Sequence, residues 1–294
     1  MAGQVPREHG RYDYSAIVDR KPLRWPDGAR VAVWVIPNIE HFLFDSGGVT
    51  ASGAASGLKP DVMNFSWRDY GLRVGIWRLM EIMERHGVRG TVALNSDVTE
   101  KYPRVIEAGN ALKWEWMGHG TTNSILLNAQ DEDEERALLR QSVETIAKGV
   151  GRKPKGWLSP GLTETVRTLD LLAECGIEYV GNWVNDEQPY PMRVKSGSML
   201  SIPYTIELND IPNFLSRNRT GEEFAKQICD QFDVLYEDGA KTGRVMAIAL
   251  HPFLIGHPHR AKHFEKALAY VAQHKGVWLA TGGEIADWYK RNYL

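Results

Sequence analysis

The chain has 294 residues, 43% of them hydrophobic and 24% charged, with a formal net charge of −2. This near balance of charge favours neither nucleic acid nor an anionic membrane as a partner. The two cysteines, Cys175 and Cys229, lack paired spacing, which argues against a disulfide framework or a zinc knuckle and suits a reducing compartment. Residues 1–19 are polar and show no apolar signal segment, so we predict a cytoplasmic protein.

Short apolar runs alternate with amphipathic segments along the chain. The first strand-like run, residues 30–36, is followed by a stretch of small residues at 46–57, which we interpret as a loop able to act as a lid. Further runs that predict strands lie at residues 91–94, 113–117, 156–158, 177–180, 199–204, 245–250 and 277–280. The segments between them repeat apolar residues at helical spacing, as Ile76, Leu79, Met80 and Met83 do.

Two acidic stretches are interpreted as helix starts. The run at residues 131–135 precedes a segment with apolar residues on one face, and acidic side chains are stabilised at a helix N-terminus. Thr220 and Glu223 have the spacing of a capping box. We therefore expect solvated helix caps here rather than metal sites.

The alternation of strand and helix predicts an α/β fold. Parallel strands joined by crossover helices would form a single-domain distorted (β/α) barrel of seven or eight units over residues 1–294, with residues 1–29 as an irregular N-terminal extension. A doubly wound open sheet is the structural alternative. No Gly-x-Gly-x-x-Gly motif follows the first strand and no phosphate-binding Gly-Lys-Ser/Thr motif occurs, so a nucleotide site has little support.

Titratable residues follow the C-terminal ends of several predicted strands. Glu40 and His41 follow the first, His119 the third and His251 the seventh. In a barrel these ends converge on one mouth, so we expect the side chains to face a common substrate. A carboxylate and two histidines suit amide hydrolysis, because one group can deprotonate water while another protonates the leaving nitrogen.

The segments around these residues resemble the successive motifs of the polysaccharide deacetylase family. In chain order they are Asn38-Ile-Glu-His41, Gly118-His119-Gly120, Gly156-Trp-Leu-Ser-Pro160, Trp183-Val-Asn-Asp186 and Leu250-His251-Pro252, and the similarity runs from about Arg30 to Tyr289. They are more similar still to a branch of cyclic-amide hydrolases that includes the metal-independent allantoinases. The resemblance implies a distorted barrel, hydrolysis of non-peptide C–N bonds at its mouth, and a homo-oligomer.

This chain departs from the family pattern at the positions of the metal ligands. Metal-dependent members have paired aspartates after the first strand and two histidines four residues apart after the third. This chain has Glu40 with His41, and His119 with Asn123. Asparagine is a poor zinc ligand. Leu158 also stands where the family motif has an arginine. Either no cofactor is used, or Glu40, His41 and His119 hold one divalent metal ion.

Three residues receive catalytic roles. Glu40 is the candidate general base, because partial desolvation can raise the pKa of a carboxylate toward neutrality; a salt bridge to Arg73 is the alternative. His251 is assigned as the general acid to the leaving nitrogen or as an oxyanion partner, with a loop-fixing role as the alternative. His119 either binds a metal or positions water.

A larger set is predicted to contact the substrate. A planar imide or ureide has donors and acceptors that amide, guanidinium and carboxylate groups can match, and flat faces that tryptophan can cover. The predicted substrate-binding residues are Tyr70, Arg73, Asn95, Asn123, Trp157, Trp183, Asp186 and Glu207. Each has a structural role as its alternative.

The leading hypothesis is a hydrolase of small cyclic amides, imides or ureides. Two alternatives remain open: a metal-dependent de-N-acetylase acting in carbohydrate metabolism, and a non-catalytic binding protein on a degenerate deacetylase scaffold. The expected partner is a small-molecule substrate, without nucleic acid or membrane.

Overall fold

The computed structural model describes residues 5–46, 58–128 and 131–294. The predicted lid at 46–57 lies, except for Ser46, outside the described residues. Within the described ranges, nine strands form one sheet in the order β6-β7-β5-β4-β3-β2-β1-β8, and β9 also pairs with β1. The strands are β1 Val31–Ile39, β2 Thr91–Leu94, β3 Glu115–Gly118, β4 Gly156–Trp157, β5 Tyr179–Val180, β6 Tyr190–Met192, β7 Met199–Ser201, β8 Arg244–Leu250 and β9 Val277–Leu279.

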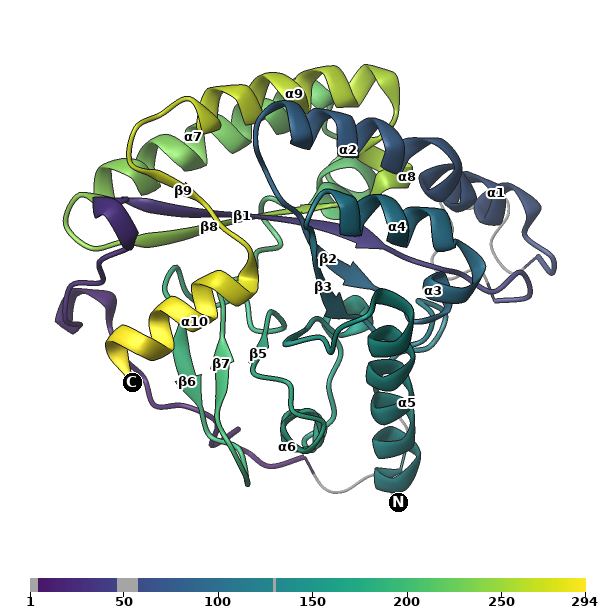
Figure 1. The fold of residues 1–294 in the computed structure, drawn as a ribbon, viewed down its shortest axis with the longest axis horizontal. Helices are drawn as coiled ribbons and strands as arrows, with labels where there is room; N and C mark the ends of the chain where they lie inside the picture. Colours follow the sequence, from purple (N-terminus) through teal and green to yellow (C-terminus); the bar gives the residue numbers. More distant parts are fainter. Residues whose placement is uncertain (1–4, 47–57, 129–130) are drawn as a thin grey trace.

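Helices cover the outer face of this sheet (Figure 1). α7 and α9 lie along β1 and β8, α2 and α4 lie beside them, and α10 lies on the opposite side of these strands. The helices are α1 Val62–Tyr70, α2 Ile76–Arg85, α3 Asp97–Lys101, α4 Pro103–Ala111, α5 Glu132–Val150, α6 Thr168–Glu174, α7 Gly221–Gly239, α8 Pro252–Ile255, α9 Pro258–Ala272 and α10 Gly282–Tyr293. A π-helical turn, Gly71–Gly75, joins α1 to α2.

The sheet is curled into a half-barrel that stays open between its edge strands, β6 and β8. Every pairing is parallel except that of β6 with β7. At the open seam, loop carbonyls satisfy the edge of β8: Val245 N donates to Glu187 O at 2.8 Å and Ala249 N to Leu208 O at 2.9 Å. The predicted α/β distorted barrel is confirmed, and the two hydrogen bonds at the seam satisfy backbone donors on the edge strand β8.

Strand alternation separates two cores. Val31, Val33 and Val35 of β1 pack outward against the helices, whereas Ala32 and Trp34 point into the barrel. β8 repeats this pattern, with alanines at positions 247 and 249 facing inward. Small residues on β8 leave room for the fully buried indole of Trp34, so the interior is filled by side chains and the site is confined to the mouth.

β1 is longer than predicted. We expected the strand to end at Ile36, before Pro37, but it continues to Ile39. On one side of β1, the pairing with β9 ends at Val33 and the pairing with β2 begins at Asn38, so Pro37 lies where the strand changes partners. Proline is tolerated there because little of the ladder is lost. Glu40 consequently follows the strand directly.

Local predictions differ in accuracy along the chain. Both predicted helix caps are confirmed, since Asp131 with Glu134 and Thr220 with Glu223 form reciprocal capping boxes. β6 was not predicted, because its sequence of three residues includes a proline. α6 begins at Thr168, after a 3-10 turn at Pro160–Leu162.

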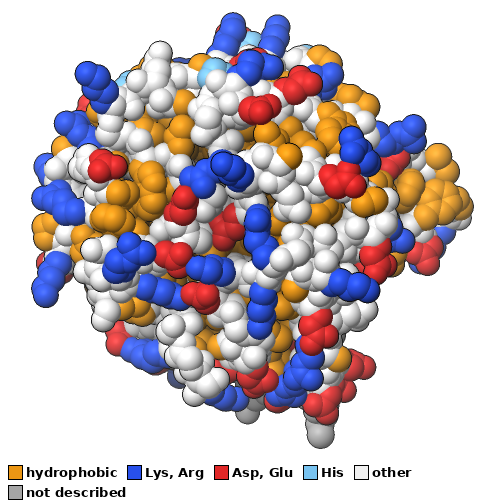
Figure 2. Space-filling model, viewed as in Figure 1, with side chains coloured by type: hydrophobic (Ala, Val, Ile, Leu, Met, Phe, Trp, Pro, Cys, Tyr) orange, Lys and Arg blue, Asp and Glu red, His pale blue; other side chains and the backbone are white. Residues whose placement is uncertain are grey.

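The surface carries both signs of charge. On the face shown in Figure 2, basic and acidic side chains are interspersed, with hydrophobic side chains between them. Across the described ranges, no helix is both long and apolar enough to cross a bilayer.

Gly75 provides a test of the packing beneath the site. A Cβ at this position would overlap the carbonyl oxygen of Pro252, directly after His251. We predict that Gly75→Ala destabilises the fold by about 1–3 kcal/mol, because overpacking forces the π-helical turn away from α8. Thermal unfolding measures the effect, and Val74→Ala, at a partly exposed neighbouring position, is the control. Equal melting temperatures for the two variants would contradict this account of the packing.

Candidate active site

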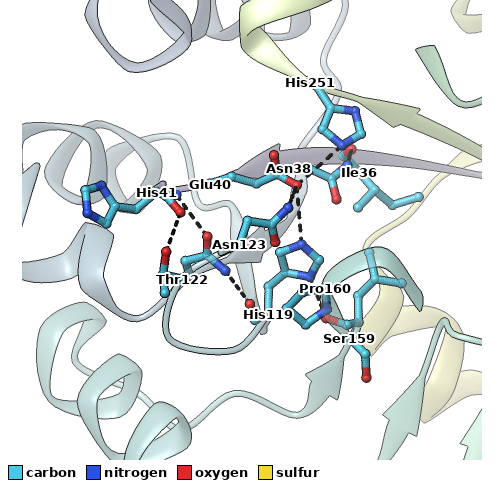
Figure 3. Close-up of polar contacts among 12 residues, drawn as sticks. Ile36, Asn38, Glu40, His41, His119, Thr122, Asn123, Ser159, Pro160 and His251 are labelled. Carbon is cyan, nitrogen blue, oxygen red and sulfur yellow. Dashed lines mark hydrogen bonds and ion pairs between the residues drawn. The ribbon is translucent and has the colours of Figure 1, made fainter. Parts of the chain in front are cut away.

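Three strand ends bring a carboxylate and two imidazoles together (Figure 3). Glu40 follows β1, His119 follows β3 and His251 follows β8. Glu40 Oε1 lies 3.5 Å from His119 Nε2 and 3.5 Å from His251 Nε2. All three side chains are at most 5% exposed. The predicted catalytic residues thus share one buried site, with Glu40 between the histidines.

His251 is held by a carboxylate that the sequence reasoning missed. Its Nδ1 donates to Asp210 Oδ1 at 2.6 Å, and its backbone N donates to Asp210 Oδ2 at 2.8 Å. The proton on Nδ1 leaves Nε2 facing Glu40. Asp210 lies in the run after the predicted strand 199–204, where we selected Glu207 instead. Its neighbour Asn209 forms a parallel bridge with Ala249 of β8, a contact that sequence spacing does not reveal.

The charges of this cluster reverse our expectation for Glu40. Burial alone would raise the pKa of Glu40, but its electrostatic interactions with the neighbouring imidazoles, chiefly the charge of His251, outweigh burial and hold the pKa well below its usual range. The predicted shift toward neutrality was therefore wrong. Burial alone would lower the pKa of His251, but Asp210 and then Glu40 outweigh it and raise the pKa to about 9. Glu40 is ionised and His251 protonated at neutral pH.

His119 presents a lone pair to the site. Its Nδ1 lies 2.5 Å from the carbonyl oxygen of Leu158, which can only accept, so Nδ1 carries the proton. Asn123 Nδ2 donates to Glu40 Oε1 at 2.7 Å. Three buried atoms lack a hydrogen-bond partner among the described residues: Glu40 Oε2, His119 Nε2 and Asn123 Oδ1. Buried acceptors of this kind require a donor, and a water molecule or a substrate N–H can supply it.

A small cavity adjoins Glu40 on the side of α1. It is lined by Glu40, His41, Phe42, Phe65, Arg68, Asp69, Leu72 and Tyr102. Arg68, which is 9% exposed, places its guanidinium 3.9 Å from the centre of the Phe42 ring. Sequence reasoning gave Arg68 no role.

The described residues do not gather the metal ligands that we considered. The ring of His41 points away from Glu40 and His119 in Figure 3 and lies 6.0 Å from the ring of Tyr102. In the described part of the chain, no group of three His, Cys, Asp or Glu side chains is arranged to hold a metal ion. The set of Glu40, His41 and His119 therefore does not fit a metal ion held by three strong ligands.

Of the predicted substrate-binding residues, Asn123 contacts Glu40 and Asn95 has a bracing role. Asn95 Oδ1 accepts from His41 N at 2.9 Å, and its Nδ2 donates to His119 O. It thus ties the ends of β1 and β3 together. Trp157 is fully buried in the core and donates to Ser159 Oγ at 2.9 Å. A polar or aromatic residue at a strand end looks the same in the sequence whether it braces the fold or contacts a substrate. The sequence alone therefore did not separate these two roles.

The remaining predicted substrate-binding residues have other partners. Tyr70 stacks on His257 at 4.2 Å, and Trp183 packs edge-on against Tyr12 at 5.6 Å. The other three form ion pairs: Arg73 with Asp69 at 3.6 Å, Asp186 with Arg20 at 2.7 Å and Glu207 with Arg217 at 2.8 Å. Arg73 is 75% exposed at its side chain, so the alternative in which it neutralises Glu40 does not hold.

Comparisons with known proteins match this architecture. Residues 63–180 match the sequence family described as polysaccharide deacetylase. A Schizosaccharomyces pombe protein, assigned only provisionally as a polysaccharide deacetylase, is 28% identical over 92% of each chain. A probable polysaccharide deacetylase from Pseudomonas aeruginosa PAO1 is 28% identical in its solved structure, with a TM-score of 0.84 over 93% of this chain and 95% of that one.

A second solved structure, the allantoinase PuuE, is 25% identical with a TM-score of 0.86 and 99% coverage of both chains. The two structures span both branches considered from the sequence. The match over residues 63–180 and the fold shared over nearly the whole length confirm the resemblance to the polysaccharide deacetylase family, and they indicate a hydrolase of C–N bonds.

Proposed function

We propose that the chain hydrolyses a C–N bond of a small cyclic amide, imide or ureide, with Glu40 as general base and His251 as general acid. The observation that carries this proposal is the buried carboxylate placed between two imidazoles, one of them with a pKa raised to about 9. The similarity to an allantoinase over 99% of both chains supports a ureide-like substrate.

The proposed reaction begins with a water molecule beside Glu40. The ionised carboxylate accepts one proton from this water, while His119 Nε2 accepts a hydrogen bond from the other O–H and thereby orients it. The water oxygen attacks the amide carbon, and negative charge develops on the carbonyl oxygen. When the C–N bond breaks, His251 Nε2 transfers its proton to the departing nitrogen. The ring-opened product carries a carboxylic acid and, on the departing nitrogen, an amine if the substrate is a cyclic amide, an amide if it is an imide, or a ureido group if it is a ureide.

Two neighbouring side chains stabilise the proposed roles of Glu40 and His251. Asp210 holds His251 in one tautomer and stabilises its protonated form. Asn123 holds Glu40 Oε1, so Oε2 is oriented as the basic oxygen. The pKa of Glu40 lies below neutrality and that of His251 lies above it. At neutral pH the proposed base is therefore ionised and the proposed acid is protonated, as the reaction requires.

A metal-dependent de-N-acetylase of a carbohydrate polymer is the second candidate, and the polysaccharide deacetylase relatives favour it. It differs in requiring a divalent metal ion and an acetylated sugar. The third candidate, a binding protein without catalysis, predicts no turnover of either class.

Turnover of a substrate panel distinguishes the three candidates. We predict ring opening of at least one of succinimide, hydantoin and allantoin, unchanged after dialysis against a chelator, and no release of acetate from N-acetylglucosamine oligomers. Glu40→Gln should lower kcat by about 100- to 10,000-fold because it removes the general base. Glu222→Gln, at an exposed position in the first turn of α7, is the matched control.

Two results would refute this assignment. Acetate release that is lost with chelator and restored by a divalent metal would favour the de-N-acetylase. Absence of turnover on every substrate, with binding unchanged in Glu40→Gln and His251→Ala, would favour the binding protein.

The pH profile tests the role of His251. Since His251 must be protonated to donate, kcat/KM should fall as pH rises through about 9, and the depressed pKa of Glu40 predicts no acidic limb near neutrality. Asp210→Asn keeps an acceptor for Nδ1 but removes the charge that raises the pKa of His251. The alkaline limb should therefore move to lower pH in this variant, and a limb that stays in place would contradict the assignment of His251 as the acid.

A further inference from the structure

We propose that Arg68 is a specificity-determining residue that binds a planar oxygen acceptor of the substrate, a carbonyl or carboxylate next to the scissile amide. This inference rests on the proposed function and narrows its substrate class. It concerns a residue on α1, away from the strand ends that carry the acid and the base.

Arg68 is positioned by rings that follow the two catalytic residues. Its guanidinium lies 3.9 Å from the ring centre of Phe42 and 5.1 Å from that of Phe253. Phe42 is two residues after Glu40, and Phe253 is two residues after His251. Cation–π contacts with both rings fix the guanidinium relative to the acid and the base at once.

The position of Arg68 places a positive charge in the wall of the site. It lines the same cavity as Glu40 and is 9% exposed. Removing a guanidinium from water is costly, and the attraction of Glu40 and Asp61 offsets part of that cost. Because arginine keeps its charge even when buried, the cavity presents a permanent cation beside the general base.

The chemistry of the guanidinium selects among the candidate substrates. Its planar set of N–H donors matches coplanar oxygen acceptors better than a tetrahedral hydroxyl. An acetamido sugar has one carbonyl, which is the group under attack. A cyclic imide or ureide has a second carbonyl in the same plane, so one can bind Arg68 while the other is hydrolysed. A lactam with a ring carboxylate offers the same type of acceptor.

The experiment compares substrates that differ by this one acceptor. Succinimide is paired with pyrrolidinone, which lacks the second carbonyl, and with pyroglutamate, which replaces it by a carboxylate; hydantoin is paired with imidazolidinone. For each pair, kcat/KM is measured in the wild type, Arg68→Met and Arg68→Lys. Where an analogue is not turned over, its inhibition constant takes the place of kcat/KM.

We expect Arg68→Met to lower kcat/KM for the acceptor-bearing substrate by about 10- to 100-fold while changing the matched analogue by less than about threefold. Arg68→Lys keeps the charge without the planar set of donors, so we expect an intermediate loss, chiefly in KM. If Arg68→Met lowers kcat/KM only for succinimide and hydantoin, the acceptor bound by Arg68 is a carbonyl. If it does so only for pyroglutamate, the acceptor is a carboxylate. Arg104→Met, at an exposed position on α4, is the control.

Equal losses on both members of every pair would overturn the inference and assign Arg68 a structural role. Circular dichroism and thermal unfolding show whether Arg68→Met is folded, and Arg68→Lys carries the same comparison if it is not. Failure of the proposed function has a different signature, because the wild type would then open none of the rings.

Discussion

The pairing of β1 with β8 is the constraint on which the candidate site depends. The two parallel strands are in register from Val31 opposite Arg244 to Pro37 opposite Leu250. β1 continues for two residues against β2, and the chain then reaches Glu40, while β8 ends one residue before His251. A slip of one residue would turn every side chain to the other face of the sheet, so the packing of both faces fixes the distance of 3.5 Å between Glu40 and His251.

Electrostatics then divide the roles between groups that are equally buried. Desolvation alone would raise the pKa of Glu40 and lower the pKa of His251. Asp210 reverses this for His251, and the resulting positive charge in turn keeps Glu40 ionised. The acid–base pair is thus a property of three residues in contact. A sequence-based argument that treats Glu40 alone considers only its burial and reaches the wrong direction for its pKa.

The sequence predicts those parts of the site that depend on strand ends. Apolar runs that stop at Glu40, His119 and His251 identify parallel strands, and parallel strands share one mouth. Asp210 and Arg68 could not be selected in the same way, because their contacts depend on how a loop meets the edge of β8 and how α1 packs on two phenylalanines. Conversely, Asn95 and Trp157 have the expected positions but brace the backbone and the core.

Asn123 shows how one change of side chain alters what the same geometry can do. The resemblance places a histidine ligand of metal-dependent relatives at this position. An amide is a weak metal ligand but a good donor to a carboxylate, and Asn123 Nδ2 donates to Glu40 at 2.7 Å. At this position the chain therefore has a hydrogen-bond donor that orients Glu40 rather than a strong metal ligand. With His41 turned toward Tyr102, the groups around the Glu40 carboxylate are two imidazoles and the amide of Asn123.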